Sequence, residues 1–177
     1  MPPFPPHRPG SLISRGLKSV LGLVFVLLML LGGPVDPAAA SDADRVDHTL
    51  TNQSGQDFHG QQLAESSFAG AVAREADFSG ADLHGSIFTQ GSFAKSNFSG
   101  ADLSDVLMDR VDMGGTNLRG AILSGVIASG SSFAGADITD ADFSGALLDR
   151  SDQVRLCRSA SGRNPVTGVD TRESLEC

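Results

Sequence analysis

A strict five-residue repeat occupies more than half of the chain and restricts what it can fold into. From Phe58 onward, every fifth residue is apolar for nineteen consecutive positions. Every Phe that follows Phe25 falls on one of these positions, which we call the central residues. The central residues are Phe58, Leu63, Phe68, Ala73, Phe78, Leu83, Phe88, Phe93, Phe98, Leu103, Met108, Met113, Leu118, Leu123, Ala128, Phe133, Ile138, Phe143 and Leu148.

A period of five fits neither of the two regular backbone structures. Five residues turn an α-helix by about 500°, so side chains spaced by five circle the helix and form no buried face. In a β-strand, an odd spacing sends successive side chains to opposite faces. A chain that turns a corner every five residues buries all the central residues inside a coil. The pattern therefore predicts an all-β solenoid.

The neighbours of the central residues agree with such a coil. The residue two positions earlier is mostly small, and strand alternation places it on the inner side with the central residue. The residue one position earlier is often Asp or Asn and is expected to point outward. The residue two positions later is Gly at eleven of the nineteen repeats, and Gly lowers the backbone cost of a tight corner.

These units resemble the pentapeptide-repeat family, whose repeat reads A-(D/N)-(L/F)-x-x. Residues 76–80, 81–85 and 141–145 have the sequences ADFSG, ADLHG and ADFSG. The resemblance extends over residues 56–150, and it implies a right-handed quadrilateral β-helix of about nineteen pentapeptide repeats, four to a coil. Residues spaced by twenty would then stack, which places Phe58, Phe78 and Phe98 in one column.

Residues 1–40 have the features of a secretory signal peptide. Arg8, Arg15 and Lys18 precede an apolar run at residues 20–31, and small residues follow it. The run is shorter than the roughly 20 apolar residues of a membrane-spanning helix. We expect cleavage between Ala40 and Ser41, after which the protein works outside the cytosol and meets the membrane only during export. An uncleaved N-terminal anchor is the alternative.

The segments on either side of the repeats differ from them in composition. Residues 41–55 are polar and are expected to form a linker and N-terminal cap. The repeat fails at Gln153, and the following residues 151–177 are expected to form a short C-terminal helical cap, with Ser151 as a possible N-cap of its first helix. Asp170 or Thr171 is a possible N-cap of a final short helix.

The chain has two cysteines, Cys157 and Cys177, and both lie in the C-terminal segment. An oxidising compartment favours a disulfide between them, which would close the cap. The alternative is a redox-active pair, although the C-x-x-C spacing of many such pairs is missing.

The C-terminal segment also resembles the tails of pentapeptide-repeat proteins from cyanobacteria and from the chloroplast thylakoid lumen. Those tails share a Leu-Cys, an Asn-Pro-x-Thr-Gly, a Thr-Arg and a final Cys. The matching positions are Leu156-Cys157, residues 164–168, Thr171-Arg172 and Cys177. The resemblance implies the thylakoid lumen or the periplasm, in agreement with the export signal.

A few outward positions are apolar where the repeat predicts a polar residue. Four of them, Ile87, Leu107, Ile127 and Leu147, are spaced by twenty and are expected to form one stripe on a single face. An exposed apolar row indicates contact with a partner, with a second copy, or with the chain's own C-terminal segment, of which the last is the plainest option. Isolated apolar residues placed outside by chance are the alternative.

Composition and motifs restrict the possible functions. Without residues 1–40 the net charge is −10, which disfavours ordinary nucleic-acid binding. We find no catalytic set, no metal-ligand spacing and no cofactor-binding motif. The sequence favours a non-enzymatic exported scaffold or protein-binding module. A redox-responsive lumenal protein acting through Cys157 and Cys177 is one alternative. A DNA-mimic binder of a topoisomerase, known in this family, is remote because an exported protein does not meet that enzyme.

Overall fold

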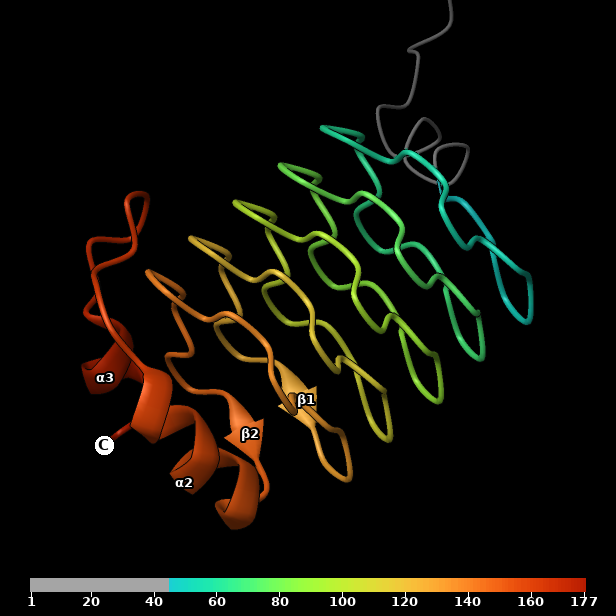
Figure 1. Cartoon of the computed structure of the whole chain (residues 1–177). Helices are drawn as coiled ribbons and strands as arrows, with labels where there is room; N and C mark the ends of the chain where they lie inside the picture. The colour runs from blue at the N-terminus through green and yellow to red at the C-terminus, as the bar shows by residue number, and fades with distance from the viewer. Residues whose placement is uncertain (1–44) are drawn as a thin grey trace, which may run out of the picture. The chain divides into compact units, whose positions relative to one another are not determined.

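The computed structural model describes residues 45–177, and Figure 1 shows most of them as a stack of coils. The residue before each central residue forms a parallel bridge with the residue twenty positions later, from Asp47↔Ser67 to Ile122↔Asp142. Strand β1, Ile127–Ala128, pairs in the same parallel way with β2, Leu147–Leu148. A step of twenty residues corresponds to four five-residue repeats in each coil.

The corners of the coils explain the positions of Gly and Asp in the repeat. The residue two positions after each centre has positive φ where it is Gly and also where it is Glu75 (φ 58°) or Arg110 (φ 57°). The Asp or Asn before the centre accepts a hydrogen bond from the backbone N–H two residues ahead, as Asp57 does from His59 at 2.9 Å. These side chains therefore hold the corner in an Asx turn.

The central residues form a continuous core. The rings of Phe58 and Phe78 stack with centroids 4.7 Å apart, and those of Phe78 and Phe98 stack at 4.8 Å. Buried Ser residues two positions before some centres are satisfied by the backbone. The Ser86 hydroxyl, for example, donates to the Leu63 carbonyl at 2.8 Å. The polar inner positions therefore leave the packed interior intact.

The coil begins earlier than residue 56, where the apolar five-residue repeat predicts its start. Asp47 and Asn52 already form bridges to the next coil, so residues 46–55 continue the same backbone path. Their centres are the polar residues His48 and Gln53, joined through Nδ1 and Nε2 at 3.1 Å. An end coil covers the core on one side only, which explains why it tolerates polar centres. The predicted signal peptide and its cleavage site at Ala40 and Ser41 lie outside the described residues.

The C-terminal segment contains helix α2, Arg150–Ser159, and helix α3, Thr171–Ser174. Helix α2 crosses the end of the coil stack (Figure 1), and its Leu156 is buried in the core. Its N-cap is Asp149, not Ser151, and the Asp149 carboxylate instead accepts from the Gly130 N–H at 3.0 Å. Asp170 caps α3 as expected. Within residues 45–177, no helix is long and apolar enough to cross a membrane.

Candidate binding surface

The four predicted stripe residues form one straight column on the outside of the coils. Ile87 pairs with Leu107, Leu107 with Ile127, and Ile127 with Leu147, each one coil apart. Their exposed fractions are 38%, 41%, 39% and 60% in that order. We call these four residues the apolar column. A continuous exposed apolar row of this kind is a candidate contact surface.

The C-terminal segment does not cover the apolar column, contrary to the plainest expectation from the sequence. All four side chains remain exposed, and the C-terminal segment approaches only Leu147, at one end of the column. Its contacts instead run to other sides of the last coils. The Asn164 amide donates to the carbonyls of Gly120, Ala121 and Asp140, each at 3.1 Å. Residues 45–177 therefore leave the apolar column exposed.

A second outer column is polar and internally bonded. The Asn97 amide donates to Asp77 Oδ1 at 3.0 Å, and the Asn117 amide donates to Asn97 Oδ1 at 2.9 Å. Hydrogen bonds from the Ser79 hydroxyl and N–H, and a smaller contribution from Asn97, hold the pKa of Asp77 below its ordinary value. These Asp and Asn residues are therefore structural, and their oxygens are already used within the coil.

Replacing Asn97 by Asp should destabilise this polar column. The Asn97→Asp variant puts a carboxylate where an amide donates to Asp77, so the coil loses a hydrogen bond and gains repulsion. We expect a loss of about 1–2 kcal/mol in unfolding free energy at pH 7. The loss should shrink as the pH falls below about 4 and one carboxylate is protonated. Chemical denaturation at both pH values measures the effect.

The matched control for this variant is Asp102→Asn on the neighbouring face. Asp102 accepts from the backbone N–H and hydroxyl of Ser104, and an amide oxygen still accepts both bonds, each weaker than with a carboxylate. We expect a smaller loss of stability for this control than for Asn97→Asp. Equal losses in both variants, or a loss for Asn97→Asp that does not depend on pH, would contradict the role assigned to the Asn97 amide.

The structure brings together a set of His, Ser and Asp side chains, which the sequence analysis did not find. His59 Nδ1 lies 2.9 Å from the Ser79 hydroxyl, which donates to Asp77 Oδ1 at 2.6 Å. A second set of the same kind joins His84, Ser104 and Asp102. In both sets the Asp carboxylate bonds to the Ser hydroxyl and not to the imidazole, which differs from a catalytic triad, where the carboxylate orients the His. The His–Ser contacts join residues twenty positions apart and therefore tie adjacent coils together.

The described residues contain no group of three or more His, Cys, Asp or Glu side chains arranged to hold a metal ion. The structure does join Cys157 to Cys177, with Cα atoms 5.6 Å apart. This disulfide ties helix α2 to the residues that follow α3. It thereby closes the segment that contains Asn164, a buried residue whose part in the fold the sequence did not reveal.

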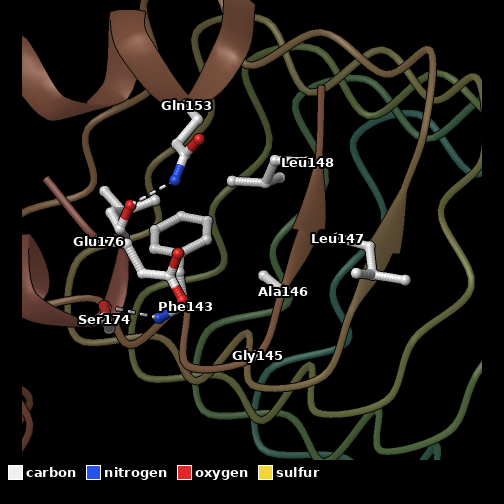
Figure 2. Close-up of a pocket in the computed structure, with 9 residues that line it drawn as sticks. Phe143, Gly145, Ala146, Leu147, Leu148, Gln153, Ser174 and Glu176 are labelled. Carbon is white, nitrogen blue, oxygen red and sulfur yellow. Dashed lines mark hydrogen bonds between the residues drawn. The ribbon is translucent and has the colours of Figure 1, made fainter. Parts of the chain in front are cut away.

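A pocket of about 300 Å³ lies where the C-terminal segment meets the last coil. Figure 2 shows Gln153 and Ser174 on one side of the Phe143 ring and the segment from Gly145 to Leu148 on the other. Leu147 belongs both to this lining and to the apolar column. The column and the pocket are therefore parts of one continuous surface.

Comparison with protein families identifies the repeat. The Pentapeptide repeats family matches residues 57–90, 92–125 and 123–152, more than half of the chain. The chain belongs to the pentapeptide-repeat family, whose members fold as right-handed quadrilateral β-helices. Members of this family are generally structural or binding modules. No curated protein matches the chain.

Solved structures give the same assignment. The chain is similar to a pentapeptide repeat protein from the Arabidopsis thaliana thylakoid lumen, with 33% identity and a TM-score of 0.72. That match covers 84% of this chain and 98% of the other. A Nostoc PCC 7120 pentapeptide repeat protein matches at 18% identity and a TM-score of 0.50, covering 63% and 92% of the two chains, and this likeness supports the fold alone.

The plasmid-mediated fluoroquinolone resistance protein QnrB1 also matches. Its identity is 20% and its TM-score is 0.38, over 58% of this chain and 67% of the other. A likeness of this size carries no argument about what the present chain binds.

Proposed function

We propose that this protein is an exported, non-enzymatic binding module that contacts a protein partner through the apolar column. The observation that carries the proposal is the column itself, four large apolar side chains in register and exposed on one face. The repeat calls for a polar residue at each of these positions, and a polar residue would cost the fold little. Four successive exceptions on one face therefore favour a contact surface over chance.

The location of the proposed activity is the thylakoid lumen or the periplasm. The signal-like residues 1–40 and the likeness to a thylakoid-lumen protein both support export. We further propose that all nineteen central residues belong to one β-helix, which α2, α3 and the disulfide cap at its C-terminal end. A rigid stack of coils presents a flat face and loses little binding energy to ordering itself.

A double variant tests whether the column contacts a partner. Leu107→Asn with Ile127→Asn places two polar amides on the exposed face, away from the core, and sets no like charges side by side on adjacent coils. We expect its melting temperature and its elution volume in size-exclusion chromatography to match those of the wild type. Capture from a lumenal or periplasmic extract should lose one protein that the wild type retains and that Asn117→Ser, on the polar column, also retains.

Two outcomes of this experiment would contradict the proposal. If the double variant melts at a clearly lower temperature, the column has a structural role within the chain. If wild type, double variant and control retain the same proteins, the column contacts no partner. A shift to a smaller species in size-exclusion chromatography would show that the column joins two copies of this chain.

A redox-responsive protein acting through Cys157 and Cys177 is a second candidate. One observation favours it: Cys177 is exposed, and the disulfide fixes both α2 and the residues after α3 at the end of the last coil. Thiol trapping of the protein in its own compartment, with and without added reductant, tests this candidate. A pair that stays oxidised under every condition would eliminate it.

A further inference from the structure

We propose that the Cys157–Cys177 disulfide acts as a redox switch: its reduction by a dithiol protein releases residues 171–177 from the last coil and extends the apolar column along the end of the stack. The inference rests on the proposed function, because the uncovered surface adjoins the column and would regulate what the column binds. The part that moves is helix α3 with the three residues after it.

The first part of the C-terminal segment is fastened without the disulfide. The Asn164 amide donates to the carbonyls of Gly120, Ala121 and Asp140, each at 3.1 Å. The Asp140 N–H donates to the Ser161 carbonyl at 2.8 Å. None of these four bonds involves a residue after position 164. This part of the segment is therefore expected to keep its place on the coils when the disulfide is reduced.

The second part of the segment, residues 171–177, is held by fewer contacts. The Phe143 N–H donates to the Ser174 hydroxyl at 3.0 Å, and the Gln153 amide donates to the Leu175 carbonyl at 2.7 Å. The exposed Arg172 side chain donates to a carbonyl of helix α2 at 2.7 Å. Helix α3 has four residues, far fewer than the roughly 12–15 that an isolated helix needs. The disulfide is the one covalent bond that joins this part to helix α2.

The two sulfur atoms differ in accessibility, which determines how reduction proceeds. Cys177 is exposed, whereas Cys157 is half-buried against the core. A thiolate of the dithiol protein attacks the Cys177 sulfur, the S–S bond breaks, and the Cys157 thiolate leaves and takes up a proton. The second thiol then displaces Cys177 from the mixed disulfide. The dithiol is oxidised to a disulfide, and both cysteines of this chain end as thiols.

Release of residues 171–177 uncovers an apolar surface that continues the column. Leu175 is 2% exposed and lines the same pocket as Phe143, Ala146 and Leu148. In Figure 2 the ring of Phe143 lies between Leu148 and the residues that would leave. Leu147 belongs both to this lining and to the apolar column. The column would then extend from Leu147 onto Phe143 and Leu148.

Two backbone N–H groups of the last coil report on the two parts of the segment separately. The Phe143 N–H bonds to Ser174, which leaves, and the Asp140 N–H bonds to Ser161, which stays. Hydrogen–deuterium exchange read by NMR on the full chain, with and without dithiothreitol, compares them. We expect reduction to accelerate exchange at Phe143 roughly 100-fold, the factor that closing a loop of about this length contributes in the chain-entropy model. Exchange at Asp140 should not change.

Two variants control this measurement. Cys157→Ser with Cys177→Ser should show fast exchange at Phe143 without any reductant, and dithiothreitol should then have no further effect. Asn164→Ala in the oxidised chain should accelerate exchange at Asp140 more than at Phe143, the reverse of reduction.

Nile red, a neutral apolar dye, tests whether release uncovers the surface beside the column. Its fluorescence with the wild type should rise on reduction, and Leu147→Asn should lessen the rise. The serine double variant should also retain more of any partner that the column captures than the oxidised wild type does. If exchange at Phe143 and the dye respond to reduction but no state of the chain captures a partner, the proposed function fails and the switch stands.

Three results would overturn the proposal. They are exchange at Phe143 that does not respond to reduction, equal acceleration at Phe143 and Asp140, and Nile red fluorescence that is the same in the oxidised and reduced chains. The first would show that Leu175 and the hydrogen bonds hold residues 171–177 without the disulfide. The second would show that the whole C-terminal segment leaves as one unit.

Discussion

The Phe78→Ala variant should lose about 3–5 kcal/mol of unfolding free energy. Phe78 is fully buried, and its ring is stacked between those of Phe58 and Phe98 at 4.7 and 4.8 Å. Truncation removes the ring and leaves a cavity between two rigid coils. The coils cannot close this cavity, because the parallel bridges fix their spacing on every side. Denaturant unfolding followed by circular dichroism measures the loss.

The matched control is Phe78→Leu, which keeps most of the volume and loses the stacked ring. We expect it to cost less than about 1.5 kcal/mol. A loss for Phe78→Ala of less than 1 kcal/mol, or equal losses for the two variants, would show that the Phe column does not hold the coils together.

The Asn164→Ala variant should have the second-largest effect, a loss of about 2–4 kcal/mol. The buried Asn164 amide donates to three carbonyls, and its oxygen accepts from the N–H groups of Val166 and Thr167 at 2.9 and 3.0 Å. Without this side chain, the Gly120, Ala121 and Asp140 carbonyls lose a partner beneath the C-terminal segment. Denaturant unfolding measures the loss, and hydrogen–deuterium exchange should show faster amide exchange in residues 161–175.

Asn164→Asp separates the two halves of this network. It keeps the acceptor for Val166 and Thr167 but has no N–H to donate, and it brings a charge close to three carbonyl oxygens. We expect it to be at least as destabilising as Asn164→Ala at neutral pH. A stability equal to that of the wild type in either variant would contradict the assignment of Asn164 as the residue that fastens the segment.

The core of the fold could be predicted from the sequence because the repeat is strict. A period of five allows only a coil that turns at each repeat, and Phe58, Phe78 and Phe98 stack as their spacing predicts. The start of the coil was misplaced because His48 and Gln53 are polar, while the backbone path depends on the corners and not on the centres.

Of the candidate surface, the apolar column could be predicted from the sequence and the pocket could not. Spacing by twenty places Ile87, Leu107, Ile127 and Leu147 on one face, so the column follows from the repeat alone. The pocket depends on where a non-repeating tail meets the last coil, and no periodicity determines that. The role of Asn164 was likewise hidden, because its three carbonyl partners lie 24 to 44 positions away in the chain.

Site-specific photo-crosslinking tests the proposed contact surface most directly. A photoreactive residue at position 107 lies in the apolar column, and one at position 117 lies in the polar column. In a lumenal or periplasmic extract, position 107 should give a single crosslinked partner that position 117 does not give. Adding Ile127→Asp should abolish that adduct. Equal crosslinking from both positions, or none from position 107, would contradict the proposal that the apolar column binds a protein partner.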